Sequence, residues 1–222
     1  GMFMPVGTGA TKDKGLFRRT APIFDPAACT GCLDCAMVCP DVAIPNTVHE
    51  IHDLLLAGIA AAEGTDAQRD ALRSKVYPLA EAVRETYRQD KTPRTFADIV
   101  ADAAAAVDAD ADVTMRATFD SMVAHLATFP VARTRPFFDS MEKEQPGSGG
   151  LFSAVVDPWK CTGCLQCVDV CGAGALTAVD QDADVLAQLE QRFETMTIPP
   201  DLDYDSLEGL SAEAREKLKK SE

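Results

Sequence analysis

Eight cysteines in the chain form two quartets of identical spacing, C-x2-C-x2-C-x3-C. The first quartet is Cys29, Cys32, Cys35 and Cys39, with Pro40 directly after it, and the second is Cys161, Cys164, Cys167 and Cys171, with Gly172 after it. Bacterial proteins that bind [4Fe–4S] clusters through cysteine thiolates use this spacing. Because a cluster takes four thiolates, the chain is predicted to bind two [4Fe–4S] clusters and to leave no cysteine over.

The spacing also predicts how the cysteines are shared between the clusters. Cysteines at i, i+3 and i+6 can wrap around three corners of one cluster, whereas the fourth points away from it. In two-cluster ferredoxins this fourth cysteine binds the other cluster. We therefore expect one cluster to be held by Cys29, Cys32, Cys35 and Cys171 and the other by Cys161, Cys164, Cys167 and Cys39.

Other uses of cysteine fit the spacing less well. Zinc ribbons pair CxxC knuckles with four sulfurs to one metal, which would leave sulfurs over in each quartet. Radical enzymes use a three-cysteine run, C-x3-C-x2-C, that neither quartet contains. A disulfide framework conflicts with a composition typical of a reducing compartment.

The residues around the quartets repeat as well. Asp25 to Leu33 aligns with Asp157 to Leu165, and both segments contain the sequence Cys-Thr-Gly-Cys-Leu. Short β-prone segments flank the quartets: Ile23-Phe24 and Ala154 to Val156 precede them, and Val42 to Ile44 and Leu176 to Val179 follow them. The pattern predicts an α+β protein with a pseudo-twofold, bacterial two-[4Fe–4S] ferredoxin-like cluster fold.

One difference between the quartets has two interpretations. Pro40 has no backbone N–H, whereas Gly172 can donate a hydrogen bond, and hydrogen bonds to cluster sulfur raise the reduction potential. The two clusters would then differ in potential partly for this reason. Alternatively, Gly172 only relaxes a turn.

A large helical insertion separates the cysteine motifs, since the 121 residues 40–160 lie between Cys39 and Cys161. The predicted helices are 46–62, 66–89 (interrupted or kinked near Pro78), 95–108, 112–129 and a short turn at 136–141, with a further helix at 182–196. The predicted domains are a lead-in at 1–20, a ferredoxin-like two-cluster domain at 21–45 and 151–180, an insertion and connector at 46–150, and C-terminal helices and linker at 181–222.

No residue of the insertion is predicted to be catalytic. His49 and His52, three residues apart, could in principle bind a metal. They have only Glu50 and Asp53 as neighbours at ligand spacing, a pattern more typical of surface residues. The acidic run from Asp98 to Asp112 is either a solvated face or a docking surface for a basic partner.

Charge and hydropathy restrict the possible partners. The formal net charge is −14 before any cluster is counted, which disfavours nucleic acid and anionic lipid and favours basic surfaces on redox partners, or serves solubility alone. The nine-residue uncharged run Leu54 to Ala62 is shorter than the roughly 20 residues that span a bilayer. The N-terminus lacks the features of a signal peptide. A cytoplasmic protein with no membrane segment is expected.

The chain resembles the two-cluster ferredoxin-like domain of pyruvate:ferredoxin (flavodoxin) oxidoreductase and related 2-oxoacid oxidoreductases. The resemblance lies in Pro5-Val6-Gly7-Thr8, in both quartets, and especially in Thr162 to Cys171, and it covers about residues 5–45 and 150–180. Gly172 in place of proline and the length of the insertion depart from that family.

The resemblance implies a role in electron transfer. In that family, thiamine diphosphate on another domain decarboxylates a 2-oxoacid, coenzyme A accepts the acyl group, and electrons leave through clusters to ferredoxin or flavodoxin. This chain lacks the Gly-Asp-Gly metal-binding motif of a thiamine site. We therefore expect thiamine diphosphate, Mg²⁺ and coenzyme A only on other domains or subunits, and no catalytic site here. Two alternatives stay open: a freestanding ferredoxin-type carrier, and the iron–sulfur subunit of another redox complex such as a hydrogenase or formate dehydrogenase.

Overall fold

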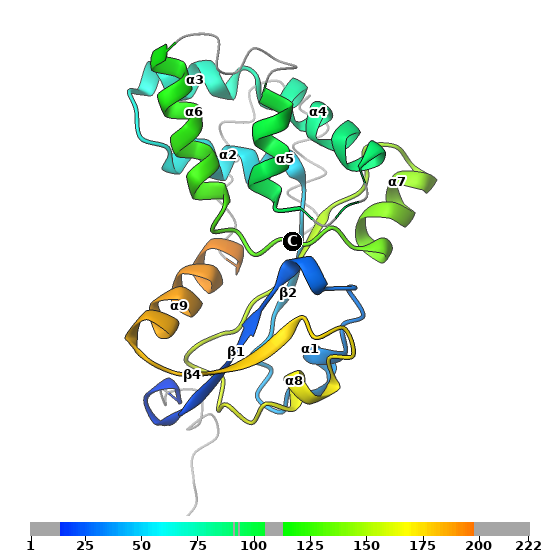
Figure 1. Ribbon diagram of the computed structural model, residues 1–222, viewed down its shortest axis with the longest axis vertical. Helices are drawn as coiled ribbons and strands as arrows, with labels where there is room; N and C mark the ends of the chain where they lie inside the picture. The colour runs from blue at the N-terminus through cyan, green and yellow to red at the C-terminus, as the bar shows by residue number, and fades with distance from the viewer. Residues whose placement is uncertain (1–13, 91, 93, 105–112, 198–222) are drawn as a thin grey trace, which may run out of the picture.

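The chain folds into a cluster-binding part and a helical part that lie end to end, as Figure 1 shows. The structure is a computed structural model, and it describes residues 14–90, 92, 94–104 and 113–197. The cluster-binding part contains both cysteine quartets, and the helical part is the insertion between them. Helix α9 (Ala183–Thr197) lies beside the cluster-binding part and reaches toward the insertion.

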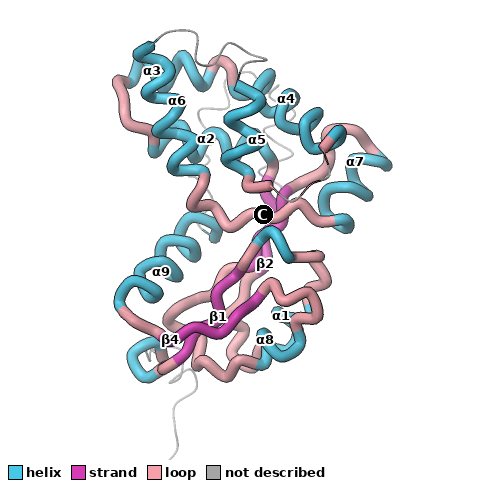
Figure 2. Tube along the Cα trace, in the orientation of Figure 1, coloured by secondary structure: helices cyan, strands magenta, loops and turns pink. Residues whose placement is uncertain are grey.

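Two antiparallel strand pairs connect segments that are far apart in the sequence (Figure 2). Strand β1 (Thr20–Phe24), before the first quartet, pairs with β4 (Leu176–Asp180), after the second. Strand β2 (Asn46–His49), after the first quartet, pairs with β3 (Leu151–Ala154), before the second. Each pair therefore joins one half of the repeat to the other, which supports an α+β ferredoxin-like arrangement.

Each quartet loop contains a short helix. The first loop has a 3-10 turn, η3 (Pro26–Ala28), and helix α1 (Asp34–Val38), and the second has helix α8 (Gln166–Val170). Helices α1 and α8 pack against each other across the pseudo-twofold axis. Beneath them the strands and loops bury a small core that includes Phe24, Ile44, Phe152 and Leu176.

The insertion has its own hydrophobic core. Its helices are α2 (Ile51–Ala61), α3 (Asp66–Arg73), α4 (Val76–Gln89), α5 (Phe96–Ala103) and α6 (Val113–Leu126), followed by a π-helical segment, η5 (Arg135–Asp139), and α7 (Ser140–Glu144). Leu55, Ile59, Val83, Val100 and Met122 are almost completely buried within it. Leu151, Val155 and Met196 join the same core, so the insertion packs onto the chain that leaves it. The domain boundaries drawn from the sequence stay a prediction.

The start of the first predicted helix was wrong. Asn46 to His49 form strand β2, because they pair with β3, and the helix begins only at Ile51. Glu50 does not complete a capping box with Thr47. Its backbone is extended at the helix N-terminus, and the Thr47 hydroxyl contacts the His49 ring instead.

Two of the predicted strands also needed correction. Val42 adopts a left-handed backbone with φ of 51°, which prevents the predicted strand over Val42 to Ile44. The strand before the second quartet is Leu151–Ala154 rather than Ala154 to Val156. The strands at Ile23-Phe24 and Leu176 to Val179 were predicted correctly.

The predicted helix over 66–89 is interrupted, one of the two expected alternatives, because the chain turns at Ser74 and Lys75 between α3 and α4. Pro78 itself lies within α4. It is the third residue of this helix, where a missing backbone N–H costs no intrahelical hydrogen bond. Helix α5 is capped by Thr95, whose side chain accepts a hydrogen bond from the Asp98 N–H.

Several expectations fall outside the described residues. These are the Pro5 to Thr8 motif, the end of the helix predicted to reach Asp108, the acidic positions 108–112, and everything after 197. Within the described part of the chain, no helix is both long enough and apolar enough to cross a bilayer.

A buried ion pair holds the end of the insertion in place. Nη1 of Arg84 on α4 lies 2.7 Å from Oε1 of Glu142 on α7, and the side chains of both residues are buried. Glu142 also accepts hydrogen bonds from the backbone N–H groups of Gly147 and Gly149. The connector of residues 145–150, which runs into β3, is therefore held in place by α4 and α7.

Candidate cluster-binding site

The two quartet loops have the same backbone path. Gly31 and Gly163, each between the first two cysteines of its quartet, have φ of 74° and 73°, and Leu33 and Leu165 follow with φ of 70° and 61°. Such left-handed positions bend each loop sharply, so that its thiols point to one side. The third cysteine of each quartet lies on the helix that begins directly afterwards, Cys35 on α1 and Cys167 on α8.

Thiols of the two quartets lie close enough to affect one another. Beside burial, which is the largest cause, Cys32 and Cys171 raise the pKa values of Cys29 and Cys35. Cys39 raises the pKa of Cys161, and Cys161, Cys164, Cys35 and Cys39 raise that of Cys167. We name the two predicted ligand groups the Cys29 set (Cys29, Cys32, Cys35, Cys171) and the Cys161 set (Cys161, Cys164, Cys167, Cys39). The assignment of one cluster to each set stays a prediction.

Burial raises the pKa of several of these thiols. In the Cys29 set, burial and the neighbouring Cys29 thiol raise the pKa of Cys35 to about 11. In the Cys161 set, burial and the neighbouring thiols raise the pKa of Cys167 to about 12. The Cys35 and Cys167 thiols are therefore protonated in the metal-free chain, and binding of iron must release their protons.

The fourth cysteine of each quartet is held by the same hydrogen bond. The Ala43 N–H donates to Sγ of Cys39, and the Ala175 N–H donates to Sγ of Cys171, both at 3.2 Å. The same two alanines accept across the axis, since Asp157 N donates to the Ala43 carbonyl at 2.7 Å and Asp25 N donates to the Ala175 carbonyl at 2.8 Å. Each fourth cysteine is thus tethered to the start of the opposite loop.

Asp41 links the two loops directly. Its carboxylate accepts hydrogen bonds from Nζ of Lys14 and from Oγ1 of Thr162, which lies between the first two cysteines of the second quartet. These hydrogen bonds, that of Lys14 first, lower the pKa of Asp41. Asp41 is therefore an anion at neutral pH and joins the lead-in, the first loop and the second loop.

A cavity lies at the Cys29 set. All four thiols of the set line it, and the rest of its wall is largely apolar, with Phe24, Phe152, Ala154 and Leu176 among the residues. Cys39 is absent from the wall, whereas Cys171 from the opposite quartet is present. The site therefore has the four thiolate donors of an iron–sulfur cluster beside a largely apolar wall, with Cys32 exposed at its edge.

The spacing of the thiols does not suit a single metal ion. No three Cys, His, Asp or Glu side chains among the residues that the structure describes are close enough to hold one ion. A tetrahedral zinc site, with Zn–S of about 2.3 Å, would bring its sulfurs within roughly 4 Å of one another. In a [4Fe–4S] cluster each thiolate binds a different iron, so the sulfurs lie farther apart than in a zinc site.

Different segments cover the two loops, and the sequence did not predict either cover. A Cβ added at Gly163 would lie 2.7 Å from Cγ of Arg18, and one added at Gly31 would lie 3.1 Å from Cβ and Oγ1 of Thr134. Arg18 and Thr134 are both buried. Neither lies near a cysteine in sequence, so only the three-dimensional arrangement reveals them.

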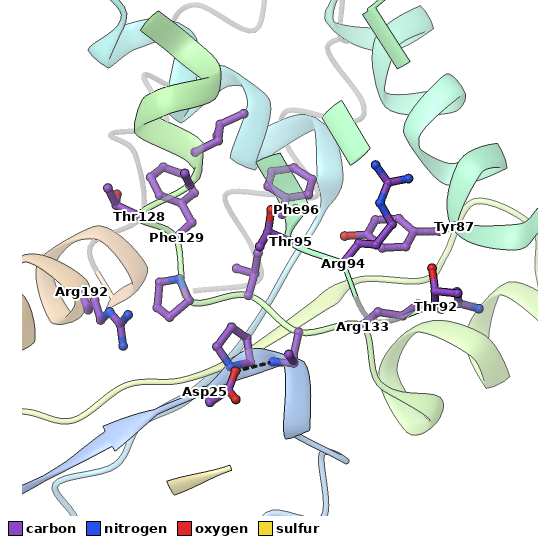
Figure 3. A pocket seen from close by; sticks show the side chains of 17 residues that line it. Asp25, Tyr87, Thr92, Arg94, Thr95, Phe96, Thr128, Phe129, Arg133 and Arg192 are labelled. Carbon is purple, nitrogen blue, oxygen red and sulfur yellow. Dashed lines mark hydrogen bonds between the residues drawn. The ribbon is translucent and has the colours of Figure 1, made fainter. Parts of the chain in front are cut away.

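A second cavity, shown in Figure 3, lies between the insertion and the cluster-binding part. Three arginines and Asp25 are among its lining residues, but no cysteine is. The arginines already donate to the protein: Arg94 to Asp102, Arg133 to Asp139, and Arg192 to the carbonyl of Phe24. The cavity is therefore a gap between the two parts of the molecule and is separate from the thiols.

His49 and His52 do not form a metal site with each other. His52 lies within ion-pair distance of Glu50 and Asp53 and stacks on Tyr77. Burial lowers the pKa of His49, whose ring contacts the Thr47 hydroxyl. Both rings therefore have partners within the protein.

Comparison with known proteins supports the interpretation of the cysteines. The family model described as 4Fe-4S binding domain matches residues 154–177, which include the whole second quartet. The chain contains an iron–sulfur domain. A second model, described as tRNA modifying enzyme MnmG/GidA C-terminal helical bundle, matches residues 186–222, of which only the end of α9 is described. Neither match covers half of the chain. No curated protein and no solved structure matches it.

Proposed function

We propose that this chain transfers electrons through two neighbouring [4Fe–4S] clusters, one held by the Cys29 set and one by the Cys161 set. The observation that carries the proposal is that the fourth cysteine of each quartet lies near the other loop, which supports an exchange of fourth ligands: Cys171 lines the cavity of the first loop, and Cys39 interacts with Cys161 and Cys167 of the second. The match to a 4Fe-4S binding domain supports the type of cluster. Bound clusters supply one-electron redox chemistry that needs no acid or base.

The protein's part is to hold the clusters close together and to limit water. Helices α1 and α8 pack against each other. The thiols of Cys35 on α1 and Cys167 on α8 interact with each other across the pseudo-twofold axis. Cys161 and Cys167 are buried, while Cys32 and Cys164 are exposed. Electrons can therefore enter near one exposed cysteine and leave near the other, while the buried thiols lie between them.

The proposal extends to the assembly in which these electrons move. We propose that the chain is the ferredoxin-like domain or subunit of a 2-oxoacid oxidoreductase. It would take electrons from a thiamine-diphosphate site on another domain and pass them to ferredoxin or flavodoxin. The resemblance of both quartets to that family supports this role, as does a net charge of −14, which favours basic surfaces on partners. A freestanding carrier and a subunit of another redox complex are the competing roles.

Iron analysis with electron paramagnetic resonance (EPR) spectroscopy tests the cluster content. Anaerobically reconstituted protein is expected to hold about eight irons and eight sulfides per chain. After reduction, two adjacent clusters should give a spin-coupled spectrum. About four irons, or bound zinc, would contradict the proposal.

A second experiment tests the assembly. The tagged chain is purified anaerobically from its natural host, together with the proteins that accompany it, and 2-oxoacid, coenzyme A and thiamine diphosphate are added. Bleaching of the cluster absorbance that needs all three supports the 2-oxoacid oxidoreductase. Bleaching on addition of hydrogen or formate instead would assign the chain to one of the other redox complexes. Purification of the chain alone would favour a freestanding carrier.

A further inference from the structure

Two buried polar atoms without a hydrogen-bond partner lie against equivalent positions of the two loops. Among the described residues, the buried side-chain nitrogen and oxygen atoms that lack a partner are Nη2 of Arg18, Oδ1 of Asn46 and Oγ1 of Thr134. The side chain of Arg18 contacts Gly163, and that of Thr134 contacts Gly31. Such groups are costly to bury, so an unpaired one points to a partner that the protein chain itself does not supply.

Arg18 is held firmly at the second loop. Its Nη1 donates to the carbonyls of Pro158 and Cys161, at 2.9 and 3.0 Å, and its Nε donates to Oε1 of Gln181 at 2.6 Å. Gln181 is fixed in turn, since its Nε2 donates to the carbonyl of Gly15. Only 6% of the residue is exposed and Nη1 donates to the Cys161 carbonyl, so the guanidinium lies at the Cys161 loop and not in water.

Thr134 occupies the corresponding place at the first loop, but it is neutral. The residue is 2% exposed and directly precedes the π-helical segment η5 at the end of the insertion. Its carbonyl accepts the N–H groups of Phe138 and Asp139. These bonds fix its backbone while its hydroxyl faces Gly31 unpaired.

We propose that Nη2 of Arg18 faces the cluster of the Cys161 set and that Oγ1 of Thr134 faces the cluster of the Cys29 set. The positive charge of Arg18 then gives the Cys161-set cluster the higher reduction potential. This inference rests on the proposed function. Each reduction adds one electron to a cluster and neither makes nor breaks a bond. A fixed cation stabilises the added negative charge more than a neutral hydroxyl does, above all where water is excluded. The electron on a half-reduced chain therefore resides at the second loop.

Anaerobic redox titration followed by EPR tests this assignment, with iron content measured on every sample. Arg18→Gln is expected to lower the potential of one cluster by at least the 59 mV that corresponds to a tenfold change in its reduced-to-oxidised ratio. The other cluster should be little affected. Arg18→Lys keeps the charge and should retain most of the potential. Thr134→Val removes only the hydroxyl and should lower the potential of the other cluster by a smaller amount.

The matched controls are Arg69→Gln on α3 and Thr86→Val on α4, which should leave both potentials unchanged. Unchanged potentials in Arg18→Gln with about eight irons retained would overturn the inference and leave the proposed function intact. Equal shifts in the reduction potentials of both clusters would also overturn the inference. If Arg18→Gln loses its iron, the other two variants decide: a loss of about 59 mV or more in Arg18→Lys, or a wild-type potential in Thr134→Val, overturns the inference. A wild-type chain with fewer than about eight irons would instead contradict the proposed function.

Discussion

The two quartet loops have nearly the same backbone but different surroundings. Both bend at a left-handed glycine and leucine, both lead into a five-residue helix, and both tether their fourth cysteine by an alanine N–H. The second loop, however, is covered by Arg18 from the lead-in, and the first is covered by Thr134 from the end of the insertion. The repeated residues therefore give the two loops the same shape, and the unrepeated residues give them different surroundings.

This difference indicates a second role for the insertion. The buried ion pair of Arg84 and Glu142 holds the end of the insertion in place. The segment from Thr134 to Glu142 runs from the first loop to that ion pair. The insertion thus has a hydrophobic core of its own and also supplies the cover of one cluster site. The second loop depends instead on residues 14–19, close to the start of the described chain.

The largest expected effect comes from removing cysteines in pairs. If the fourth cysteines are exchanged, Cys35→Ala with Cys171→Ala removes two ligands from one cluster, and about four irons should remain. Cys35→Ala with Cys39→Ala removes one ligand from each cluster and should cost far more of the iron. The measurement is iron and sulfide content after anaerobic reconstitution.

The matched pair of variants makes the outcome decisive. Both carry the same number of substitutions, and both retain Cys29 and Cys32. If each quartet instead held its own cluster, the two results would be reversed. Equal iron in both variants would contradict either arrangement.

The sequence predicted the parts of the fold that are repeated and local. Fixed spacing between cysteines determines which thiols can share one loop, whereas the partition of the ligands into the Cys29 and Cys161 sets stays a prediction. The strand pairs could be anticipated only in outline. Pairing of Asn46 to His49 with Leu151 to Ala154 joins segments about a hundred residues apart, and helical propensity near residue 46 obscured it.

The sequence could not reveal that Arg18 and Thr134 cover the two loops, nor that the backbone of Val42 is strained. Arg18 and Thr134 reach the loops because the lead-in and the insertion fold back onto them, and no local pattern encodes that contact. Val42 has the β-branched side chain of a strand residue, but the turn that directs the Ala43 N–H at Cys39 forces it into a left-handed backbone. Tertiary constraints outweighed propensity at these positions.

The glycines at the bends should respond differently to substitution, because their covers differ. At Gly163 an added Cβ would meet the carbonyl oxygen of Thr20 at 2.5 Å, in strand β1, whereas at Gly31 it would meet only side chains, at 3.1 Å or more. Left-handed strain affects both positions, at roughly 1–2 kcal/mol. Overpacking against the strand adds about 1–3 kcal/mol at Gly163.

We therefore expect Gly163→Ala to destabilise the protein by about 3 kcal/mol and Gly31→Ala by about half as much. Anaerobic urea unfolding followed by circular dichroism measures both. Equal losses in the two variants would show that the covers do not constrain the bends differently.

Val42 and Gly174 occupy equivalent turns, three residues after the fourth cysteine of each quartet, with φ of 51° and 68°. A β-branched residue in this region is strained by roughly 1–2 kcal/mol, and glycine is not. Val42 is 78% exposed, so its removal costs little packing. After the entropic cost of glycine, Val42→Gly should stabilise the protein by about 0.5–1 kcal/mol.

The reverse substitution is the control. Gly174→Val introduces the same strain into the second turn and should destabilise by about 1–2 kcal/mol. Both are measured by the same unfolding experiment. A destabilised Val42→Gly variant would mean that the valine side chain makes a contribution that outweighs its backbone strain.

The smallest effect is expected at Gly172, where the second quartet lacks the proline of the first. A Cβ at Gly172 would meet nothing within 4 Å, and its φ lies outside the left-handed region. The preceding residue, Cys171, has φ of −74° and ψ of 86°, near the extended region that proline favours before it. Gly172→Pro should change stability by less than about 0.5 kcal/mol. If the difference between the cluster potentials comes from Arg18, both potentials should also stay unchanged in a redox titration. A shift confined to one cluster in Gly172→Pro would show instead that the Gly172 N–H contributes to the inequality of the two sites.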